Sequence, residues 1–310
     1  MKKICSIVAI LSAMLLSCSR IDEHVAGVGD KGDEMVLKAR LTDDTKTYFE
    51  ADGASGMKLL WSKNDCIDVV SDDLTSHVFS MKDVEGQGAG HANATFAGRI
   101  ASGEKPMMAL YPSGSIKSPT GFIDIKTLFK DGQLPPGFEN AKDYCFLSFD
   151  SLLENQKYSP NPDGNLNYMF SPIVGDELVF SNLCSYFKFQ FKGDAKVGKV
   201  VISAVYPSAV SFYVLGVIID NDGKIMLIEP LVTTHVDDIS FNPLWSEWTN
   251  PIDEITLDCG EGVQLSDEQK PFYIAVNSQF FENGFTLRIY DTEGNLLYNK
   301  NNNKKIELKP

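Results

Sequence analysis

Short stretches in which apolar and polar residues alternate recur along most of the chain, and no long stretch shows a sustained helical period. Alternation with a period of two is typical of β-strands, and the Gly, Asn, Asp and Pro residues between the stretches favour turns. In the first half we expect strands at Met35–Leu41, Met57–Trp61, Cys66–Ser71, Val78–Met81, Asn93–Arg99 and Met107–Tyr111. In the second half we expect strands at Leu178–Phe180, Tyr186–Phe191, Lys199–Val205, Ser211–Asp220, Lys224–Ile228, Glu254–Asp258, Phe272–Asn277, Phe285–Tyr290 and Leu296–Asn299. The pattern therefore predicts an all-β protein.

The expected strands form two series that are separated by a long mixed stretch. This stretch runs from Gly114 to about Pro172, and prolines at 135 and 136 mark a loop within it. The second series begins near Glu177. We therefore expect two Greek-key β-sandwich domains in tandem, one over residues 35–176 and one over residues 177–310.

Large apolar residues at strand spacing indicate where the cores lie. Trp61 alternates with Leu59, so we expect Trp61 to fill the first core, and we expect Asp65 to accept amide hydrogens from the turn before it. Three phenylalanines share one face of a strand in the second half: Phe187, Phe189 and Phe191.

The N-terminus has the features of a bacterial lipoprotein signal. Lys2 and Lys3 precede an apolar run from Ile4 to Leu16, which is too short to span a membrane and fits a signal peptide. The sequence Leu-Leu-Ser-Cys that ends at Cys18 matches a lipobox, so we expect residues 1–17 to be removed and Cys18 to carry lipid. An ordinary signal peptide with an incidental cysteine is the alternative. Residues 18–34 are rich in Gly and Asp and indicate a flexible tether.

The charge of the chain excludes some partners. The net charge is −14, and removal of Lys2 and Lys3 with the signal peptide makes it −16. Such acidity argues against nucleic acid as a partner and against peripheral binding to anionic lipid. A lipid anchor on Cys18 remains compatible with it.

No combination of residues in the sequence indicates catalysis or metal binding. The four body cysteines lie far apart at positions 66, 145, 184 and 259, which argues against a zinc site and leaves disulfides open. Cys184 lies in an apolar run, where we expect it to pack as a small hydrophobic residue. No histidine has metal-ligand spacing, no nucleophile elbow is present, and the glycine-rich Gly86–Gly90 stretch lacks the residues of a phosphate-binding loop. We therefore expect a protein that is not an enzyme and has no cofactor.

Two other features are candidates for binding or modification. Trp245 and Trp248 lie in a Pro-bounded segment, where exposed rings could stack on a glycan or anchor a protein partner, or alternatively cap the second core. Ser151 lies in an Asp-Ser-Leu sequence that resembles a short O-glycosylation sequon.

The order of several motifs resembles the fimbrillin-like (Mfa-like) surface lipoproteins of Gram-negative anaerobes. The likeness is carried by the lipobox and by the following segments: Thr45-Lys46-Thr47, Leu60–Val69 (LWSKNDCIDV), Leu110-Tyr111-Pro112, Leu178–Phe189 with Lys199–Ile202, Pro271–Val276, Gly284–Ile289 and Asp291–Gly294. The resemblance implies two transthyretin-like β-sandwich domains. It also implies a fimbrial subunit, an anchor or tip component, or an adhesin, located at the outer membrane and the cell surface.

The resemblance further implies assembly by strand exchange, in which a protease removes the first strand and a strand of another fimbrial subunit replaces it. Arg40 is the candidate cleavage position, and its alternative is an outward-facing charged strand residue. No long apolar segment follows Glu307, which favours an anchor or tip over a shaft subunit. Further partners would be a host or bacterial surface protein or a glycan. The competing function is a surface glycan-binding lipoprotein that serves polysaccharide uptake.

Overall fold

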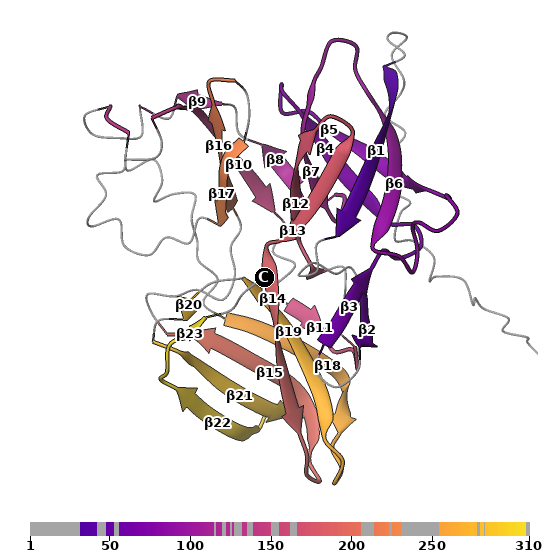
Figure 1. Ribbon diagram of the computed structural model, residues 1–310. Helices are drawn as coiled ribbons and strands as arrows, with labels where there is room; N and C mark the ends of the chain where they lie inside the picture. Colours follow the sequence, from indigo (N-terminus) through magenta and orange to yellow (C-terminus); the bar gives the residue numbers. More distant parts are fainter. Residues whose placement is uncertain are drawn as a thin grey trace, which may run out of the picture.

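The computed structural model is all-β in the part of the chain that it describes, as the sequence predicts. It describes residues 32–41, 48–52, 56–114, 116–119, 122–124, 126, 132–134, 139–149, 155–161, 166–205, 214–222, 225–230, 254–277, 280–281 and 283–307. No α-helix occurs in these ranges, and no helix in them is long and apolar enough to cross a membrane. The strands group into a barrel, a sheet beside it, and a pair of sheets below (Figure 1).

Seven strands close into a barrel in the order β1-β13-β12-β7-β4-β5-β6. Their bounds are β1 (Asp33–Leu41), β4 (Cys66–Ser71), β5 (Ser76–Lys82), β6 (Asn93–Ile100), β7 (Pro106–Tyr111), β12 (Met169–Val174) and β13 (Glu177–Asn182). All neighbours in this order are antiparallel except β1 and β13, which run parallel. The N-terminal strand therefore closes the barrel at its one parallel seam.

Trp61 occupies the centre of the barrel interior, as expected from the sequence. Its side chain is fully buried, and its ring meets Phe96, Tyr111 and Phe180 edge-on at centroid distances of 5.0, 5.7 and 5.6 Å. Its indole N–H donates a hydrogen bond of 3.1 Å to the carbonyl of Ala92. Four rings in edge-to-face contact, with the polar indole atom paired, form a closely packed core.

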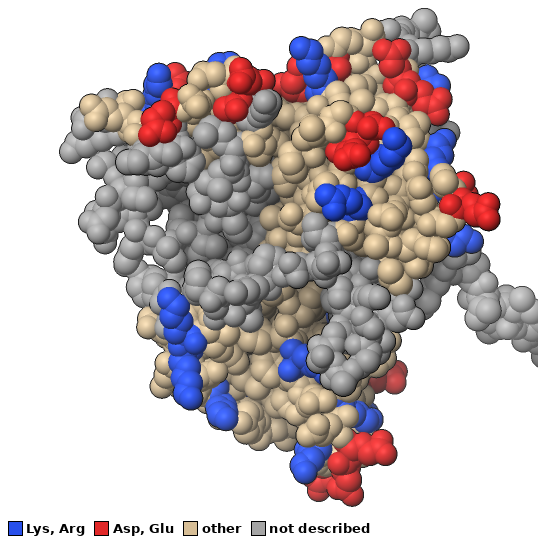
Figure 2. Space-filling model, in the orientation of Figure 1, with Lys and Arg blue, Asp and Glu red and all other residues tan. Residues whose placement is uncertain are grey.

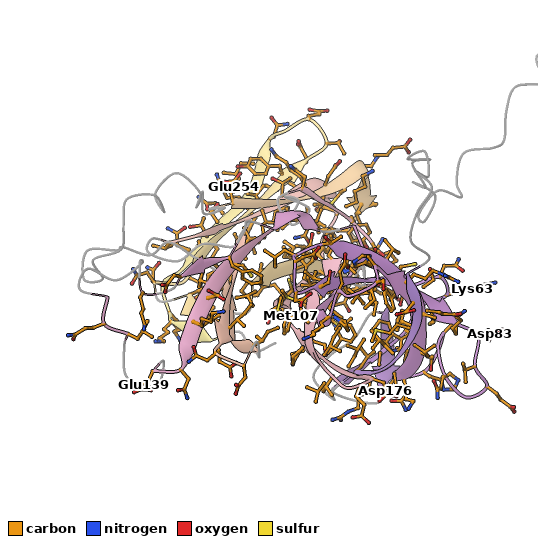
Figure 3. The ribbon with its side chains drawn as sticks, turned by 90° about the horizontal axis from the view of Figure 1, so that it is seen from above. Lys63, Asp83, Met107, Glu139, Asp176 and Glu254 are labelled. Carbon is orange, nitrogen blue, oxygen red and sulfur yellow. The ribbon has the colours of Figure 1, made fainter. Side chains whose placement is uncertain are left out.

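The outer face of the barrel is also buried on one side, because a second sheet packs against it. This sheet has the order β17-β16-β10-β8, with β9 also paired to β10. Its strands are β8 (Ile116–Pro119), β9 (Ile123–Asp124), β10 (Ala141–Phe149), β16 (Val214–Asp220) and β17 (Ile225–Pro230). Alternate residues of the barrel strands point to opposite sides, so Ala109 faces Trp61 while Leu110 joins a core with Cys145 and Val217 of this sheet. Seen from above, Met107 lies between the ring of the barrel and the neighbouring strands (Figure 3).

The lower part consists of two sheets that face each other. The larger has the order β11-β18-β15-β21-β22, and β14 and β19 form the smaller. Their bounds are β11 (Asn155–Lys157), β14 (Cys184–Phe191), β15 (Lys196–Ala204), β18 (Glu254–Gln264), β19 (Lys270–Asn277), β21 (Phe285–Asp291) and β22 (Leu296–Asn302). Two short pairs complete the described strands: β2 (Tyr48–Asp52) with β3 (Gly56–Leu60), and β20 (Phe280–Phe281) with β23 (Ile306–Glu307).

The three phenylalanines of β14 lie on one face, as the alternation predicts. Phe187 and Phe189 stack at 5.5 Å, and Phe189 and Phe191 stack at 6.0 Å. Phe187 also contacts Phe285 of the larger sheet at 4.9 Å. The row of rings therefore fills the space between the two sheets.

A buried glutamine joins the edges of these two sheets. Gln156 of β11 is 2% exposed, and its amide forms two hydrogen bonds with the backbone of Ala275 in β19. The side-chain Nε2 donates to the carbonyl at 2.7 Å, and the side-chain Oε1 accepts from the N–H at 2.9 Å. The amide thus takes the place that a neighbouring strand would have, and it satisfies two buried backbone groups.

The expected division between residues 176 and 177 does not coincide with a division between sheets. We expected Leu178–Phe180 to open the second domain, but β13 pairs with β1 and β12 inside the barrel. Conversely, two strands of the expected first domain pair with strands of the expected second domain: β10 pairs with β16, and β11 pairs with β18. The reason is that strand pairing joins residues far apart in sequence, whereas the expected boundary rested on the spacing of strands along the chain.

Candidate functional site

Arg40, the cleavage position predicted from the sequence, lies in β1, the strand that forms the seam of the barrel. Inward side chains alternate along β1, with Leu37, Ala39 and Leu41 exposed by 0%, 3% and 7%. Along its length β1 pairs antiparallel with β6, from Asp33 opposite Ile100 to Arg40 opposite Asn93. Its second half also pairs in parallel with β13. Removal of β1 would therefore expose an apolar groove with an unpaired strand on each side.

Arg40 lies near the end of β1 with its side chain exposed. This position matches an outward-facing strand residue, and whether Arg40 is cleaved stays a prediction. Its backbone is paired on both sides, opposite Asn93 in β6 and Val179 in β13. Because a protease must bind its substrate in an unpaired extended form, cleavage after Arg40 requires that this part of β1 first separate from both neighbours.

Few polar side-chain contacts hold β1 in place from outside. Lys38 forms an ion pair of 2.7 Å with Asp176, which raises the pKa of Lys38 and lowers the pKa of Asp176 through the hydrogen bond between them. Both side chains are more than half exposed, at 67% and 56%, so this pair contributes little to stability. At the start of the strand, Arg99 donates a hydrogen bond of 3.1 Å to the carbonyl of Gly32. Backbone pairing and the apolar side chains of β1, rather than polar side-chain contacts, therefore keep it in the barrel.

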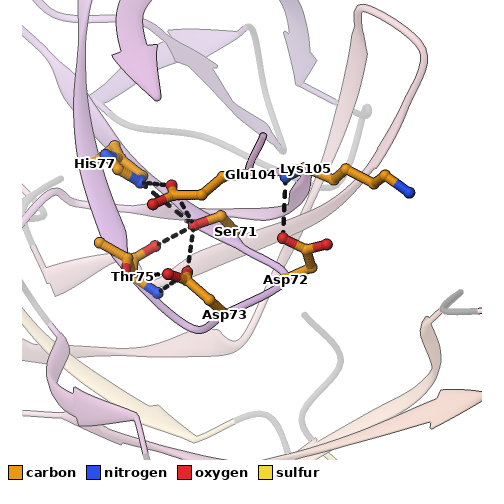
Figure 4. A network of polar contacts seen from close by, with 7 residues as sticks. All are labelled: Ser71, Asp72, Asp73, Thr75, His77, Glu104 and Lys105. Carbon is orange, nitrogen blue, oxygen red and sulfur yellow. Dashed lines mark hydrogen bonds and ion pairs between the residues drawn. The ribbon is translucent and has the colours of Figure 1, made fainter. Parts of the chain in front are cut away.

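A second cluster brings together a serine, a histidine and carboxylates beside the barrel (Figure 4). The hydroxyl of Ser71 lies 3.3 Å from His77 Nε2, 3.0 Å from Glu104 Oε2 and 2.9 Å from Asp73 Oδ1. His77 Nε2 is in turn 2.6 Å from Glu104 Oε2. The pairing of β4 with β5 places Ser71 near His77, and the turn before β7 supplies Glu104.

The geometry of this cluster differs from that of a hydrolytic triad. In a triad the two nitrogens of the histidine serve different partners, one the nucleophile and one the carboxylate. Here Ser71 and Glu104 both contact the same nitrogen, and Ser71 is fully buried. Asp73 has a lowered pKa because the Thr75 N–H and the hydroxyls of Ser71 and Thr75 donate to it. The cluster therefore ties the β4–β5 turn to the loop before β7 and offers no accessible nucleophile.

Two buried carboxylates also have structural roles. Asp65 accepts a hydrogen bond of 2.7 Å from the Ser62 N–H, as expected from the sequence, and a further one of 3.1 Å from the Tyr111 hydroxyl. Asp68 is 3% exposed, and burial raises its pKa, although donation from Ser113 at 2.6 Å and Gly114 at 2.8 Å opposes the shift. Both residues hold loops at the same end of the barrel.

No disulfide joins the four body cysteines, all of which lie in described parts of the chain. Cys184 is 2% exposed and packs in the core, as predicted. Burial raises the pKa to about 12 in three of the thiols, which we call the buried thiols: Cys145, Cys184 and Cys259. Cys66 is partly exposed. Within the described residues, no group of three or more His, Cys, Asp or Glu side chains could hold a metal ion.

The other candidates from the sequence lie outside the described residues. These are Cys18, Ser151, Trp245 and Trp248. Two arrangements are not indicated by the sequence pattern, the Ser71 cluster and the Gln156 bridge. The expected β4–β5 hairpin could have indicated that Ser71 and His77 are neighbours, but no local pattern marks Glu104 or Gln156.

Comparison of the chain with protein-family models, with curated proteins and with solved structures found no match.

Proposed function

We propose that this chain is a non-enzymatic cell-surface lipoprotein that acts in adhesion, as a fimbrial subunit or as an anchor or tip component. The observation that supports the proposal is the position of β1. This strand follows the expected tether directly, completes the barrel by itself, and carries Arg40 at an exposed position. An N-terminal strand of this kind is suited to being replaced by a strand of another molecule.

In the proposed assembly step, cleavage after Arg40 separates most of β1 from the body. The groove between β6 and β13 then receives a strand of a second fimbrial subunit. Backbone hydrogen bonds to β6 and β13 would supply affinity, and the pockets that Leu37 and Ala39 vacate would select the incoming side chains, whereas Leu41 stays with the body after the cut. The second of these pockets holds only an alanine, so the incoming strand needs a small residue two positions from a larger apolar one.

The proposal includes the finer fold and the location that the resemblance implies. We infer two transthyretin-like domains, with lipid on Cys18 holding the chain to the outer membrane and the cell surface until any cleavage after Arg40. Support for a sandwich comes from the lower part of the molecule, where two sheets enclose the phenylalanines of β14. The two sets of strands interleave in sequence, so the proposed domains would exchange strands across residues 176 and 177.

An arginine-specific protease tests the assembly step, because the chain has only four arginines, at positions 20, 40, 99 and 288. The mature lipoprotein in detergent is treated with the protease, and the products are examined by mass spectrometry, size-exclusion chromatography and electron microscopy. We expect a cut after Arg40, followed by oligomers or filaments. The matched control is Arg40→Lys, which keeps the charge but removes the cleavage site. Cleavage at Arg40 without any oligomer would refute assembly by exchange of β1.

A further inference from the structure

The strand β22 forms one edge of the five-stranded sheet in the lower part of the molecule. It is seven residues long and pairs with β21 on one side. On its other side, no strand of the described part of the chain pairs with it. The backbone N–H and C=O groups on that side are therefore available to an added strand.

Three consecutive residues at the start of β22 expose large apolar side chains. Leu296, Leu297 and Tyr298 are 53%, 42% and 43% exposed. Directly paired residues of neighbouring strands share a face of the sheet. Tyr298 pairs with the buried Ile289 and so lies on the inner face, whereas Leu296 pairs with Tyr290 and lies on the other face. A strand that continues the sheet covers apolar groups on both faces of its edge at once.

Both ends of β22 are held in place before any partner binds. In the turn before it, the Asn295 N–H and side-chain amide donate to the Asp291 carboxylate at 2.8 and 2.9 Å. Near its end, the Thr286 hydroxyl of β21 donates to the Asn301 side chain at 3.0 Å. A template that is already ordered loses little conformational entropy when a strand is added.

The charge beside the second half of this edge is opposite to that of the whole chain, whereas Asp291 and Glu293 lie in the turn before β22. The net charge of the chain is −14, but exposed lysines lie in and just after β22, at positions 300, 304 and 305. In Figure 2 basic side chains lie along the lower left flank, over the region of β21, β22 and β23, with no acidic side chain beside them in this view. These lysines disfavour pairing of β22 with its own copy, which carries the same charges, and they attract an acidic strand.

We propose that the free edge of β22 is a docking site for an extended acidic segment of a partner protein, which binds by β-strand addition. This site is separate from the β1 seam and does not depend on the proposed exchange of β1. Backbone hydrogen bonds would supply affinity, Leu296, Leu297 and Tyr298 would contact apolar side chains of the segment, and the lysines would select for acidic ones.

The test uses a fluorescein-labelled nine-residue peptide of alternating valine and glutamate, titrated with the full mature protein and followed by fluorescence anisotropy. We expect saturable binding that weakens at high salt, because screening reduces the lysine contribution. A peptide with the same sequence but N-methylated at alternate amides cannot form the backbone ladder, and we expect it to bind at least about tenfold more weakly. A peptide with lysine in place of glutamate should also bind more weakly.

Variants locate the binding on the protein. Leu297→Glu places a negative charge on the edge and removes an apolar contact, so we expect it to weaken binding of the peptide. We also expect Lys300→Glu to weaken this binding. The matched control is Val174→Glu, which makes the same kind of change at a 73% exposed strand residue of the barrel, and we expect no effect. Urea unfolding of each variant shows whether it retains the fold.

Several results would overturn the proposal. One is equal binding of the methylated and unmethylated peptides, which would mean attraction by charge alone. Another is a folded Leu297→Glu or Lys300→Glu variant that binds the peptide with the same affinity as the wild type. A third is dimerisation of the wild type that Leu297→Glu abolishes, since the edge would then be occupied by a second copy of the chain.

Discussion

Replacement of Leu37 by alanine should release β1 from the barrel much more often than in the wild type. Leu37 is fully buried, and truncation of a buried leucine to alanine costs about 2–5 kcal/mol. When opening is fast relative to cleavage, proteolysis follows the population of the open form. At 1.4 kcal/mol for each factor of ten, even the lower value raises the rate of cleavage after Arg40 about 30-fold.

The neighbouring valine provides the control for this substitution. Val36 is 47% exposed on the outward side of β1, so Val36→Ala should change the same rate by less than about threefold. The assay is the time course of cleavage by the arginine-specific protease, resolved by mass spectrometry. The cut after Arg288 reports opening of the rest of the fold, because Arg288 lies in β21 and pairs with β15 and β22. The cut after Arg99 cannot serve for this purpose, because Arg99 pairs with Glu34 of β1 itself.

Two results would refute the reasoning. Equal rates for Leu37→Ala and Val36→Ala would mean that the inward side chains do not hold β1 in place. Acceleration of the cuts after Arg40 and Arg288 by the same factor would mean that β1 separates only when the whole protein unfolds. In that case the seam has no independent opening, and a protease could not prepare the barrel for strand exchange.

Three further predictions concern other parts of the structure. Gln156→Ala should lower the free energy of unfolding by about 1–3 kcal/mol in urea denaturation, because the buried N–H and C=O of Ala275 lose their partners. A loss below about 0.5 kcal/mol, the size typical of a surface substitution, would mean that the Gln156 hydrogen bonds do not stabilise the fold. A thiol reagent at pH 8 should label Cys66 in the folded protein. It should label the three buried thiols only after unfolding, because burial raises the pKa of these three to about 12. Rapid labelling of all four cysteines in the folded protein would mean that the three thiols are not buried. Asp73 has a lowered pKa, so it binds a proton more readily in the unfolded chain, and its stabilising contribution is present above about pH 4 and disappears as the pH falls through the lowered value. The difference in unfolding free energy between the wild type and Asp73→Ala should therefore shrink on acidification from pH 6 to pH 2, and a difference that grows would have the wrong sign.

Most of the individual strands could be predicted from the sequence, whereas their partners could not. The alternation in Met35–Leu41 correctly indicates a strand, and the structure extends it to Asp33–Leu41. The same pattern gives no information about whether its neighbours are β6 and β13, because alternation reports only which side chains are buried. Arg40 can be identified as a candidate cleavage residue from the sequence alone, but the pairing of its backbone on both sides appears only in the folded chain.

The sequence by itself determined the all-β class, the burial of Trp61 and the shared face of the β14 phenylalanines. These are local properties, because the period of two and the size of a side chain act within a few residues. The tertiary structure alone decided that β13 belongs to the barrel, that β10 and β11 pair with later strands, and that Gln156 meets Ala275. Such contacts join residues far apart in the sequence, 138 positions in the case of Lys38 and Asp176, and depend on which apolar surfaces come to cover each other. Whether an edge such as that of β22 stays open is decided in the same way, by the complete arrangement of strands.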